Sequence, residues 1–403
     1  MKKSVLIFEP CLGAISGHWE NLAESLTGAF SKSDLDVTLF GNKDQTHLHN
    51  KNLPIRPHFN QLPYVDYNNT AIMDSAKKNY LHSFLSINLD DFGPNPLLVF
   101  PTLYPPILEA ALSWLIKLID YDKIKPYDVI FIFQFPYTSK ACHQTKLLKT
   151  SPFRQLYAVS SKLAKNFQTQ YEVTVNELPM PIPLTTLPPI KQKSKNEAIK
   201  IGYFGHASVD KGFFFLHPLT QLTYQKPVEF HYHLNTNPET EVAAQAFKQP
   251  AKNICCYWGH LSKAKMTNLM AEMDILLLPY NAHLYATMPS AMFSEACLLG
   301  KVMVIPSNTW LSEQADLFQV GAITFTDHTI RSIHATLART IENYEKLHLL
   351  SQTAREAFHQ HHNVDNFVNI ILKNKKMETH AHKLSDAHIY LNKICLKSNN
   401  YRL

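Results

Sequence analysis

The chain has 403 residues, more than one hydrophobic core usually organises, so we expect two domains. Hydrophobic residues make up 45% and charged residues 18%, which is typical of globular proteins and excludes an intrinsically disordered chain. The net charge of +6 suits an anionic ligand or a membrane face, and it is too small to indicate nucleic-acid binding.

Short apolar runs alternate with amphipathic stretches in the first half of the chain, a pattern typical of a parallel sheet covered by helices. The run 177–197 is proline-rich and then lysine-rich, so it sustains neither a helix nor a central strand, and we place the linker at 186–197. Before it, strands are predicted at 4–8, 36–40, 97–100, 128–134, 155–160 and 172–176, and helices at 18–30 and 107–119.

The same alternation restarts after the linker, which predicts a second sheet. The predicted fold class is therefore α/β, with two Rossmann-like, doubly wound domains that face a central cleft. The domains cover 1–185 and 198–372, and a helical tail at 373–403 is expected to dock on a domain, with the N-terminal one favoured. Strands are predicted at 199–204, 228–234, 254–258, 274–279, 302–306 and 323–325, and long helices at 329–347 and 350–361.

The six cysteines form no CxxC pair and most lie in apolar or amphipathic runs, which indicates buried thiols and a reducing compartment. The apolar run after the basic N-terminus covers only 5–8, too short for a signal peptide, and no stretch approaches the ~20 apolar residues that span a bilayer. We therefore expect a cytoplasmic protein, with peripheral contact at the inner membrane face left open.

Ligands of open α/β sheets bind beyond the carboxyl ends of the strands, so the informative residues are those that follow predicted strands. In YFGHASVDKGFFFL, residues 203–216, a strand is followed by Lys211 and Gly212 at the expected start of a helix. A lysine there adds a cation to the positive end of the helix dipole, which suits a diphosphate. The P-loop spacing is absent, and a solvated helix start has the same pattern.

A second segment, 279–308, contains a strand end, a polar loop and a helix beginning near Ser290. Ser290 is a good N-cap, and the amides of Ala291 and Met292 would then point into the cleft. Glu295, one turn further, is placed to accept two hydrogen bonds from a ribose diol. The alternative is an ordinary surface glutamate.

A third segment follows the first strand, where Gly13 and Gly17 allow a compact turn and His18 begins a helix. The GxGxxG spacing is absent and the second strand carries no acidic residue at its end, so a dehydrogenase is disfavoured. His18 either packs at the helix start or has a catalytic role.

A fourth segment, YWGHLSKAKM, is another strand followed by a turn and a helix. The backbone of Gly259, His260 and Leu261 in its turn is placed to bond a nucleobase edge.

The order of these pieces resembles the GT-B type glycosyltransferases, specifically the retaining, nucleotide-sugar-dependent group of the family 4 kind. In that family the second domain opens with a strand, a Gly-Arg and a later Lys-Gly. Here Gly205, Lys211 and Gly212 match, and His206 replaces the arginine. The later motif has two glutamates followed by Ala and Gly. Its matching residues are Glu295, Ala296 and Gly300, with Thr287 in place of the first glutamate.

The resemblance implies that 1–185 is the acceptor domain and 198–372 the nucleotide-sugar donor domain, in which Lys211 binds the donor diphosphate and Glu295 the ribose. The amides from Ser290 to Met292 would contact phosphate and sugar, Thr287 would alter the contact to the donor sugar, with Tyr285 or His283 as substitutes, and Gly17 with His18 would form the family's glycine loop. The implied activity moves a sugar from a nucleotide-diphosphate sugar to a glycan, glycolipid or other hydroxyl acceptor, as in polysaccharide or lipopolysaccharide biosynthesis. It proceeds with retention and without a metal or cofactor.

Several alternatives stay open at this point. An inverting enzyme would need a general base, for which His18 is the candidate. A nucleotide-sugar epimerase has the same two-domain architecture, and a non-catalytic nucleotide or glycan binder would explain His206 and Thr287. The histidine groups 231/233, 359/361/362 and 380/382 lack partner carboxylates or cysteines, so no metal site is predicted.

The acceptor site is the least defined part of the prediction. The amphipathic segment 105–125 and the basic region 140–154 together suit a lipid-linked acceptor. The competing interpretation, which we favour, is a helix that packs against its sheet.

Overall fold

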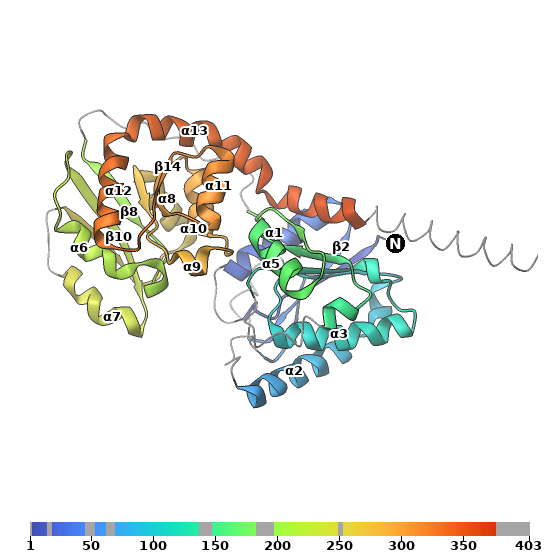
Figure 1. Cartoon of the computed structure of the whole chain (residues 1–403). Helices are drawn as coiled ribbons and strands as arrows, with labels where there is room; N and C mark the ends of the chain where they lie inside the picture. The colour runs from blue at the N-terminus through green and yellow to red at the C-terminus, as the bar shows by residue number, and fades with distance from the viewer. Residues whose placement is uncertain are drawn as a thin grey trace, which may run out of the picture. The chain divides into compact units, whose positions relative to one another are not determined.

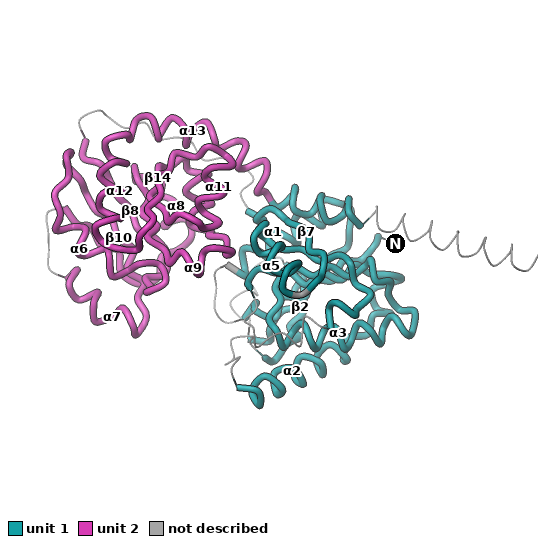
Figure 2. Tube along the Cα trace, in the orientation of Figure 1, with its two compact units in different colours: residues 1–183, 364–403 teal, residues 184–363 magenta. Residues whose placement is uncertain are grey.

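The computed structural model describes residues 2–13, 18–44, 53–61, 69–136, 147–182, 197–248 and 253–375. They form two compact units, each built on its own sheet (Figures 1 and 2). Unit 1 comprises the described residues up to 182 and from 364 onward, and unit 2 those from 197 to 363. The predicted α/β class with two Rossmann-like sheets is confirmed.

Unit 1 has a parallel sheet of strand order β3-β2-β1-β4-β5-β6-β7. Its strands are β1 (Ser4–Phe8), β2 (Asp36–Asn42), β3 (Ile55–Phe59), β4 (Leu97–Phe100), β5 (Val129–Phe133), β6 (Gln155–Ala158) and β7 (Asn176–Glu177). Its helices are α1 (His18–Lys32), α2 (Thr70–Leu85), α3 (Pro105–Asp120) and α5 (Ser161–Tyr171), with short 3₁₀ turns η2 (Leu89–Phe92) and η3 (Pro126–Asp128).

Both faces of this sheet are buried, as β1 illustrates. Leu6 and Phe8 point into the apolar cluster that contains α2 and α3, whereas Val5 and Ile7 point into the cluster that contains α1. Alternate side chains of a strand face opposite sides, so a strand covered on both sides is apolar throughout. That is why the sheet strands appear in the sequence as short continuous apolar runs.

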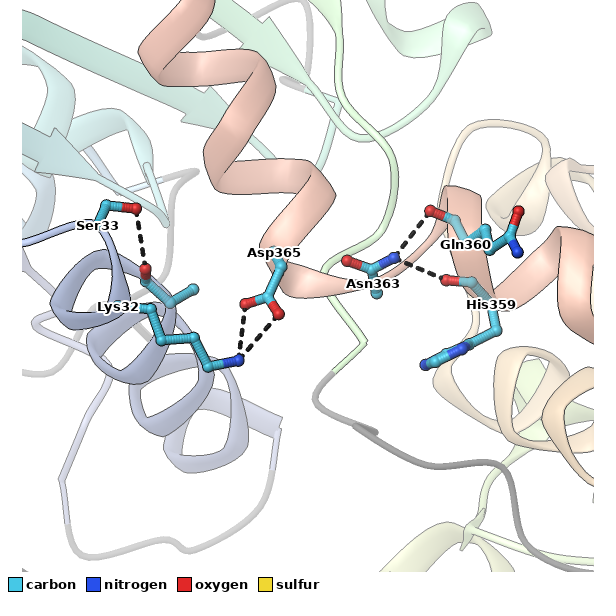
Figure 3. A network of polar contacts seen from close by, with 7 residues as sticks. Lys32, Ser33, His359, Gln360, Asn363 and Asp365 are labelled. Carbon is cyan, nitrogen blue, oxygen red and sulfur yellow. Dashed lines mark hydrogen bonds and ion pairs between the residues drawn. The ribbon is translucent and has the colours of Figure 1, made fainter.

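A helix at residues 364–375 returns the chain to unit 1 and covers the α1 side of the sheet. Asp365 forms an ion pair with Lys32 of α1 at 2.9 Å (Figure 3), and Lys375 pairs with the buried Asp128. The predicted second domain extends to residue 372, but the chain re-enters unit 1 at Val364. The apolar residues that this helix adds to the cluster are Val364, Phe367, Val368 and Ile371.

Unit 2 has the strand order β11-β10-β8-β12-β13-β14, all parallel, and β9 pairs with β10. Its strands are β8 (Ile199–Tyr203), β9 (His206–Ala207), β10 (Val228–Thr236), β11 (Ile254–Trp258), β12 (Ile275–Leu277), β13 (Val302–Pro306) and β14 (Ala322–Phe325). Its helices are α6 (Leu216–Thr220), α7 (Pro238–Ala244), α8 (Lys263–Glu272), α9 (Ala282–Tyr285), α10 (Ala291–Leu298), α11 (Trp310–Phe318), α12 (Ile330–Glu342) and α13 (Tyr344–His361), with 3₁₀ turns η5 (Val209–Lys211), η6 (Phe213–Phe215) and η7 (Gln245–Lys248).

Some predicted elements differ from those observed. Two helices were predicted at 329–347 and 350–361, with a break near 348. The break lies at Asn343 instead, and α13 continues through the predicted break. The strand predicted at 172–176 is only the two-residue β7. Two observed elements were not predicted: β3, an edge strand interrupted by Pro57, and helix α2.

Helix α3 packs into the core of unit 1, as the favoured interpretation expects. Its residues from Pro105 to Leu112, together with Trp114 and Leu115, are buried, and many of them belong to the same apolar cluster as α2. Residues 140–146 of the basic region lie outside the described residues. Within the described residues, no helix is both long and apolar enough to cross a bilayer.

We predict opposite effects for alanine at two glycines. A Cβ at Gly321, just before β14, would lie 1.8 Å from the carbonyl oxygen of Leu347 and 2.7 Å from Oγ of Ser351, so α13 would have to move. Gly321→Ala should therefore lower the free energy of unfolding by about 1–3 kcal/mol or more. Gly28→Ala, in α1 with open space around its Cβ, should raise it by about 0.5–1 kcal/mol. Urea denaturation measures both, and equal effects would contradict the packing of α13.

Candidate functional site

The strand order of unit 2 reverses at β8. The chain runs outward from β8 to β10 and β11, then crosses back to β12 on the other side of β8 and continues to β13 and β14. The loops after β8 and β12 therefore leave the same edge of the sheet in diverging directions, which is where open α/β sheets bind ligands. Both segments with the strongest sequence signal lie in these loops.

The loop after β8 brings the Lys211 ammonium next to α10. Gly205 has a φ of +103°, a conformation that side-chain-bearing residues rarely adopt. A Cβ at this position would lie 3.4 Å from both Nζ of Lys211 and Cγ of Met292. The structure thus brings Gly205 and Lys211 next to Met292, which is about eighty positions further along the chain.

Gly212 sets the position of the neighbouring Lys211, because its backbone packs directly against Pro279. It has a φ of +72°, and a Cβ there would lie 2.0 Å from the carbonyl oxygen of Pro279, which ends the β12 segment. The amide of Asn281 also donates to the carbonyl of Asp210 at 2.8 Å. The two loops at the switch point are therefore held against each other through their backbones.

The helix expected to begin at Lys211 is not present. Lys211 ends the 3₁₀ turn η5, another 3₁₀ turn follows, and α6 begins only at Leu216 and has five residues. A helix dipole therefore does not reinforce this lysine. The cation itself is the feature that remains.

The Lys211 ammonium is half-buried and has no ion pair or hydrogen bond with any residue of the described ranges. Its Nζ lies 5.8 Å from the centroid of the Tyr280 ring, a long cation–π distance. Burial lowers the pKa of Lys211 below its ordinary value because the charged form loses solvation. A bound anion would reverse this shift.

The buried His233 of β10 lies within electrostatic range of Lys211 and of two more histidines, His206 after β8 and His260 after β11. Nε2 of the buried His233 lies 2.7 Å from the carbonyl of Gly259, so it carries the proton, and Nδ1 is buried without a partner among the described residues. Burial lowers the pKa of His233. Positive charge on His260, His206 and Lys211 lowers it further.

His206 is exposed and begins β9. Desolvation is the larger cause that lowers its pKa, and the charge of Lys211 is the second. The site is therefore positive at Lys211 and becomes more positive at lower pH.

Helix α10 begins as predicted. The Ser290 hydroxyl accepts a hydrogen bond from the amide of Phe293 at 3.2 Å, and the helix starts at Ala291. The amides of Ala291 and Met292 belong to the first turn, where an α-helix offers no backbone acceptor. They are available to a ligand beside Lys211.

Glu295 lies one turn into α10, and its Oε2 is buried without a hydrogen-bond partner in the described part of the chain. Burial raises the pKa of this carboxyl, and nearby Lys263 partly opposes the shift. A buried carboxylate oxygen without a donor costs free energy, so a ligand hydroxyl that donates to Glu295 would recover it.

The remaining sequence candidates are distributed around this centre. Thr287 is buried between α9 and α10, Tyr285 is buried against Tyr280 with ring centroids 4.4 Å apart, and His283 is exposed. Exposed His260 and buried Leu261 follow Gly259, whose φ is +73° and whose Cβ position faces open space.

The candidates of the first domain are only partly visible. His18 begins α1, but its side chain and Gly17 lie outside the described residues. No group of three or more His, Cys, Asp or Glu side chains suited to a metal occurs within the described ranges, and His380 and His382 lie beyond them.

The comparisons with known proteins give a match at the level of structure. No protein-family model matches the sequence, and none of the curated proteins matches it. Among solved structures, a glycosyltransferase from Rickettsia africae covers 93% of this chain and 98% of its own, at 10% identity and a TM-score of 0.65. HepE from Anabaena, solved with UDP and glucose, covers 94% and 99% at 13% identity and a TM-score of 0.63.

Sucrose-phosphate synthase from Thermosynechococcus elongatus covers 96% of this chain and 100% of its own, at 11% identity and a TM-score of 0.67. The fold is GT-B. At these identities the likeness shows the fold and not the activity. In the GT-B fold of this chain, the site described above belongs to the second Rossmann-like unit.

The first Rossmann-like unit of the GT-B fold contains a polar cluster that the sequence analysis missed. Glu9, which follows β1 and is fully buried, accepts hydrogen bonds from the Thr102 hydroxyl at 2.6 Å and the Cys11 amide at 3.1 Å. Gln134, after β5, donates to the Pro101 carbonyl at 2.7 Å and to Thr102 at 3.2 Å. Only the position of Glu9 directly after an apolar strand could have indicated this cluster.

Glu9 should make unfolding depend on pH in a specific window. Burial raises its pKa from 4.5 to about 7, against the hydrogen bonds from Thr102 and Cys11. Between these values the folded state keeps a proton that the unfolded chain releases, so the free energy of unfolding falls by about 3 kcal/mol as pH rises from 4.5 to 7. Glu9→Gln lacks this decline.

The measurement is urea denaturation of wild type and Glu9→Gln from pH 4.5 to 8. The unfolding free energy of the variant minus that of wild type should rise by about 3 kcal/mol across the window. His362, whose pKa burial lowers to about 3, titrates in both proteins and cancels in the difference. Parallel profiles would show that Glu9 is not buried as described.

Proposed function

We propose that this chain is a glycosyltransferase that moves a sugar from a nucleotide-diphosphate sugar to a hydroxyl group of a glycan, a glycolipid or another acceptor. The observation that carries the proposal is the Lys211 ammonium, unpaired within the described residues, at the switch point of the second sheet. It lies beside the first turn of α10. One turn further along this helix, Glu295 has a buried carboxylate oxygen that receives no hydrogen bond from the described residues. One anionic and hydroxyl-rich ligand would satisfy both groups.

The donor fits these groups in a simple order. The diphosphate lies against Lys211 and the free amides of Ala291 and Met292, and the ribose hydroxyls donate to Glu295. The base contacts the turn at Gly259. Binding of UDP by HepE, which has the same fold at 13% identity, supports a nucleotide diphosphate as the ligand class.

The chemistry then depends on the charge of the leaving group. The bond between the anomeric carbon and the diphosphate oxygen breaks, a bond to the acceptor oxygen forms, and the acceptor proton passes to the departing phosphate. Fixed donors and cations stabilise the negative charge that develops on the diphosphate. Lys211, the α10 amides and a protonated His206 provide them, so we propose that the reaction needs no metal and retains the anomeric configuration.

Replacement of Lys211 should separate this proposal from its alternatives. Lys211→Ala should lower turnover by ~10²–10³-fold and abolish the thermal stabilisation by the cognate diphosphate. The experiment is a thermal-shift titration with UDP, GDP, ADP, CDP and dTDP, with and without magnesium. Lys226→Ala, an exposed lysine in the loop before β10 at the other edge of the sheet, is the matched control.

A shift lost in Lys211→Ala and kept in Lys226→Ala would identify the donor base. The absence of a shift with all five diphosphates would argue against a transferase. Conversion of the nucleotide sugar without an acceptor would instead indicate an epimerase, and binding without any turnover a non-catalytic binder.

His206 should make donor binding depend on pH. Because desolvation and Lys211 lower its pKa in the free protein, a bound diphosphate that favours the charged imidazole must be accompanied by proton uptake. The affinity for the diphosphate should therefore rise as pH falls from 8 to 6. His206→Arg should bind more tightly at pH 8 and show a flatter profile. Calorimetric titration at both pH values measures this, and an unchanged slope in the variant would exclude His206 from the donor site.

A further inference from the structure

The carboxyl edge of the unit 1 sheet carries a cluster of aromatic rings that the donor site does not use. Trp19 in the first turn of α1, Tyr104 at the N-cap of α3 and Phe135 after β5 meet there. The Trp19 and Phe135 rings are edge to face at 6.0 Å, and the Tyr104 and Phe135 rings are stacked at 5.7 Å. All three side chains are partly exposed.

The aromatic cluster lies at the edge of the sheet where ligands of this fold class bind. The strand order of the unit 1 sheet reverses at β1, which pairs with β2 on one side and β4 on the other. Phe135 and Tyr104 lie in the loops after β5 and β4, and Trp19 in the helix that follows the β1 loop. Ligands of open α/β sheets bind beyond this edge, beside the switch point.

A buried network holds the loops that carry the rings. Glu9 links the β1 loop to Thr102 of the β4 loop, and Gln134 of the β5 loop bonds to both Thr102 and the carbonyl of Pro101. Gln134 directly precedes Phe135, and Thr102 is two residues before Tyr104. The polar network thus fixes the backbone on which two of the three rings are mounted, which keeps a binding surface preorganised.

The charge of the described residues around the rings favours a neutral occupant over an anionic one. The described residues that flank the rings, 9–13, 18–21, 101–104 and 133–136, include Glu9 and Glu20 but no lysine or arginine. Among these described residues, a phosphate-bearing head group would find no lysine or arginine to pair with. Partly exposed rings instead suit a neutral pyranose, whose C–H face packs on an aromatic face while its hydroxyls stay in water or meet acceptor oxygens.

We propose that Trp19, Tyr104 and Phe135 bind a neutral sugar ring, the terminal residue of the acceptor. The name acceptor rests on the proposed function, whereas the binding of a neutral carbohydrate does not. The inference therefore narrows the acceptor class from any hydroxyl compound to a glycan or the glycan part of a glycolipid.

The test measures carbohydrate binding directly. Saturation-transfer difference NMR with maltose, cellobiose, lactose and the methyl glycosides of glucose, galactose and mannose identifies a binding sugar in the presence of UDP. Its affinity is then compared between wild type and Trp19→Leu and Phe135→Leu, which keep apolar volume but lose the ring. We expect about tenfold weaker binding in both.

Matched variants separate ring stacking from general damage. Trp19→Phe and Phe135→Tyr keep a ring and should bind within about threefold of wild type. Tyr121→Leu, which removes a ring that is 75% exposed beyond the other end of α3, should have no effect. A leucine variant that does not unfold cooperatively by circular dichroism is replaced by Tyr104→Leu.

Equal sugar binding in the leucine variants, or no binding of any sugar in the panel, would overturn the inference. So would binding of anionic phosphatidylglycerol vesicles that depends on the same rings. UDP titration of the same proteins reports on the donor site independently. UDP binding without sugar binding rejects only the aromatic site, and sugar binding without UDP binding rejects only the proposed transferase.

Discussion

The close approach of Gly212 to the carbonyl of Pro279 determines the geometry of the unit 2 site. A side chain at 212 would overlap that carbonyl, so the β8 loop can lie against the β12 segment only with glycine at this position. The same approach holds Lys211 beside Gly205 and Met292, and therefore beside the first turn of α10. One backbone contact thus places a cation, two free amides and a carboxylate on the same side of the sheet.

The electrostatics of this arrangement favour a ligand over water. Burial disfavours the charged forms of both Lys211 and Glu295, and among the described residues no ion pair joins these two side chains. Unpaired charges at a partly buried site are costly for folding. Proteins keep such groups where a substrate completes their interactions, and perturbed pKa values gather at functional sites for that reason.

The sequence predicted the two sheets because their central strands are buried on both faces and appear as continuous apolar runs, as in VLIF of β1. It missed β3, since Arg56 and Pro57 interrupt the pattern on an edge strand. The sequence also predicted a helix beginning at Lys211. Three phenylalanines form a 3₁₀ turn there instead, and Phe213 and Phe215 pack against the core of unit 2, which a local pattern does not reveal.

The residues of the candidate sites also fall into those that the sequence could indicate and those that it could not. Local motifs indicated Lys211, Ser290 and Glu295, because strand ends, N-caps and glycines have short-range signatures. The Glu9 cluster has none, since Thr102 is 93 residues away and the hydrogen bond between them exists only after the strands have paired. The same is true of the Trp19, Tyr104 and Phe135 rings, which come from three separate segments.

The return of the chain at Val364 has a consequence for synthesis on the ribosome. Unit 1 contributes its strands first, but its α1 face is completed by Phe367, Val368 and Ile371, which emerge only after the 180 residues of 184–363. At ~5–20 residues per second this takes roughly 10 to 40 s. During that interval the nascent chain carries an uncovered apolar surface on unit 1, which makes it a natural client for chaperones that bind such surfaces.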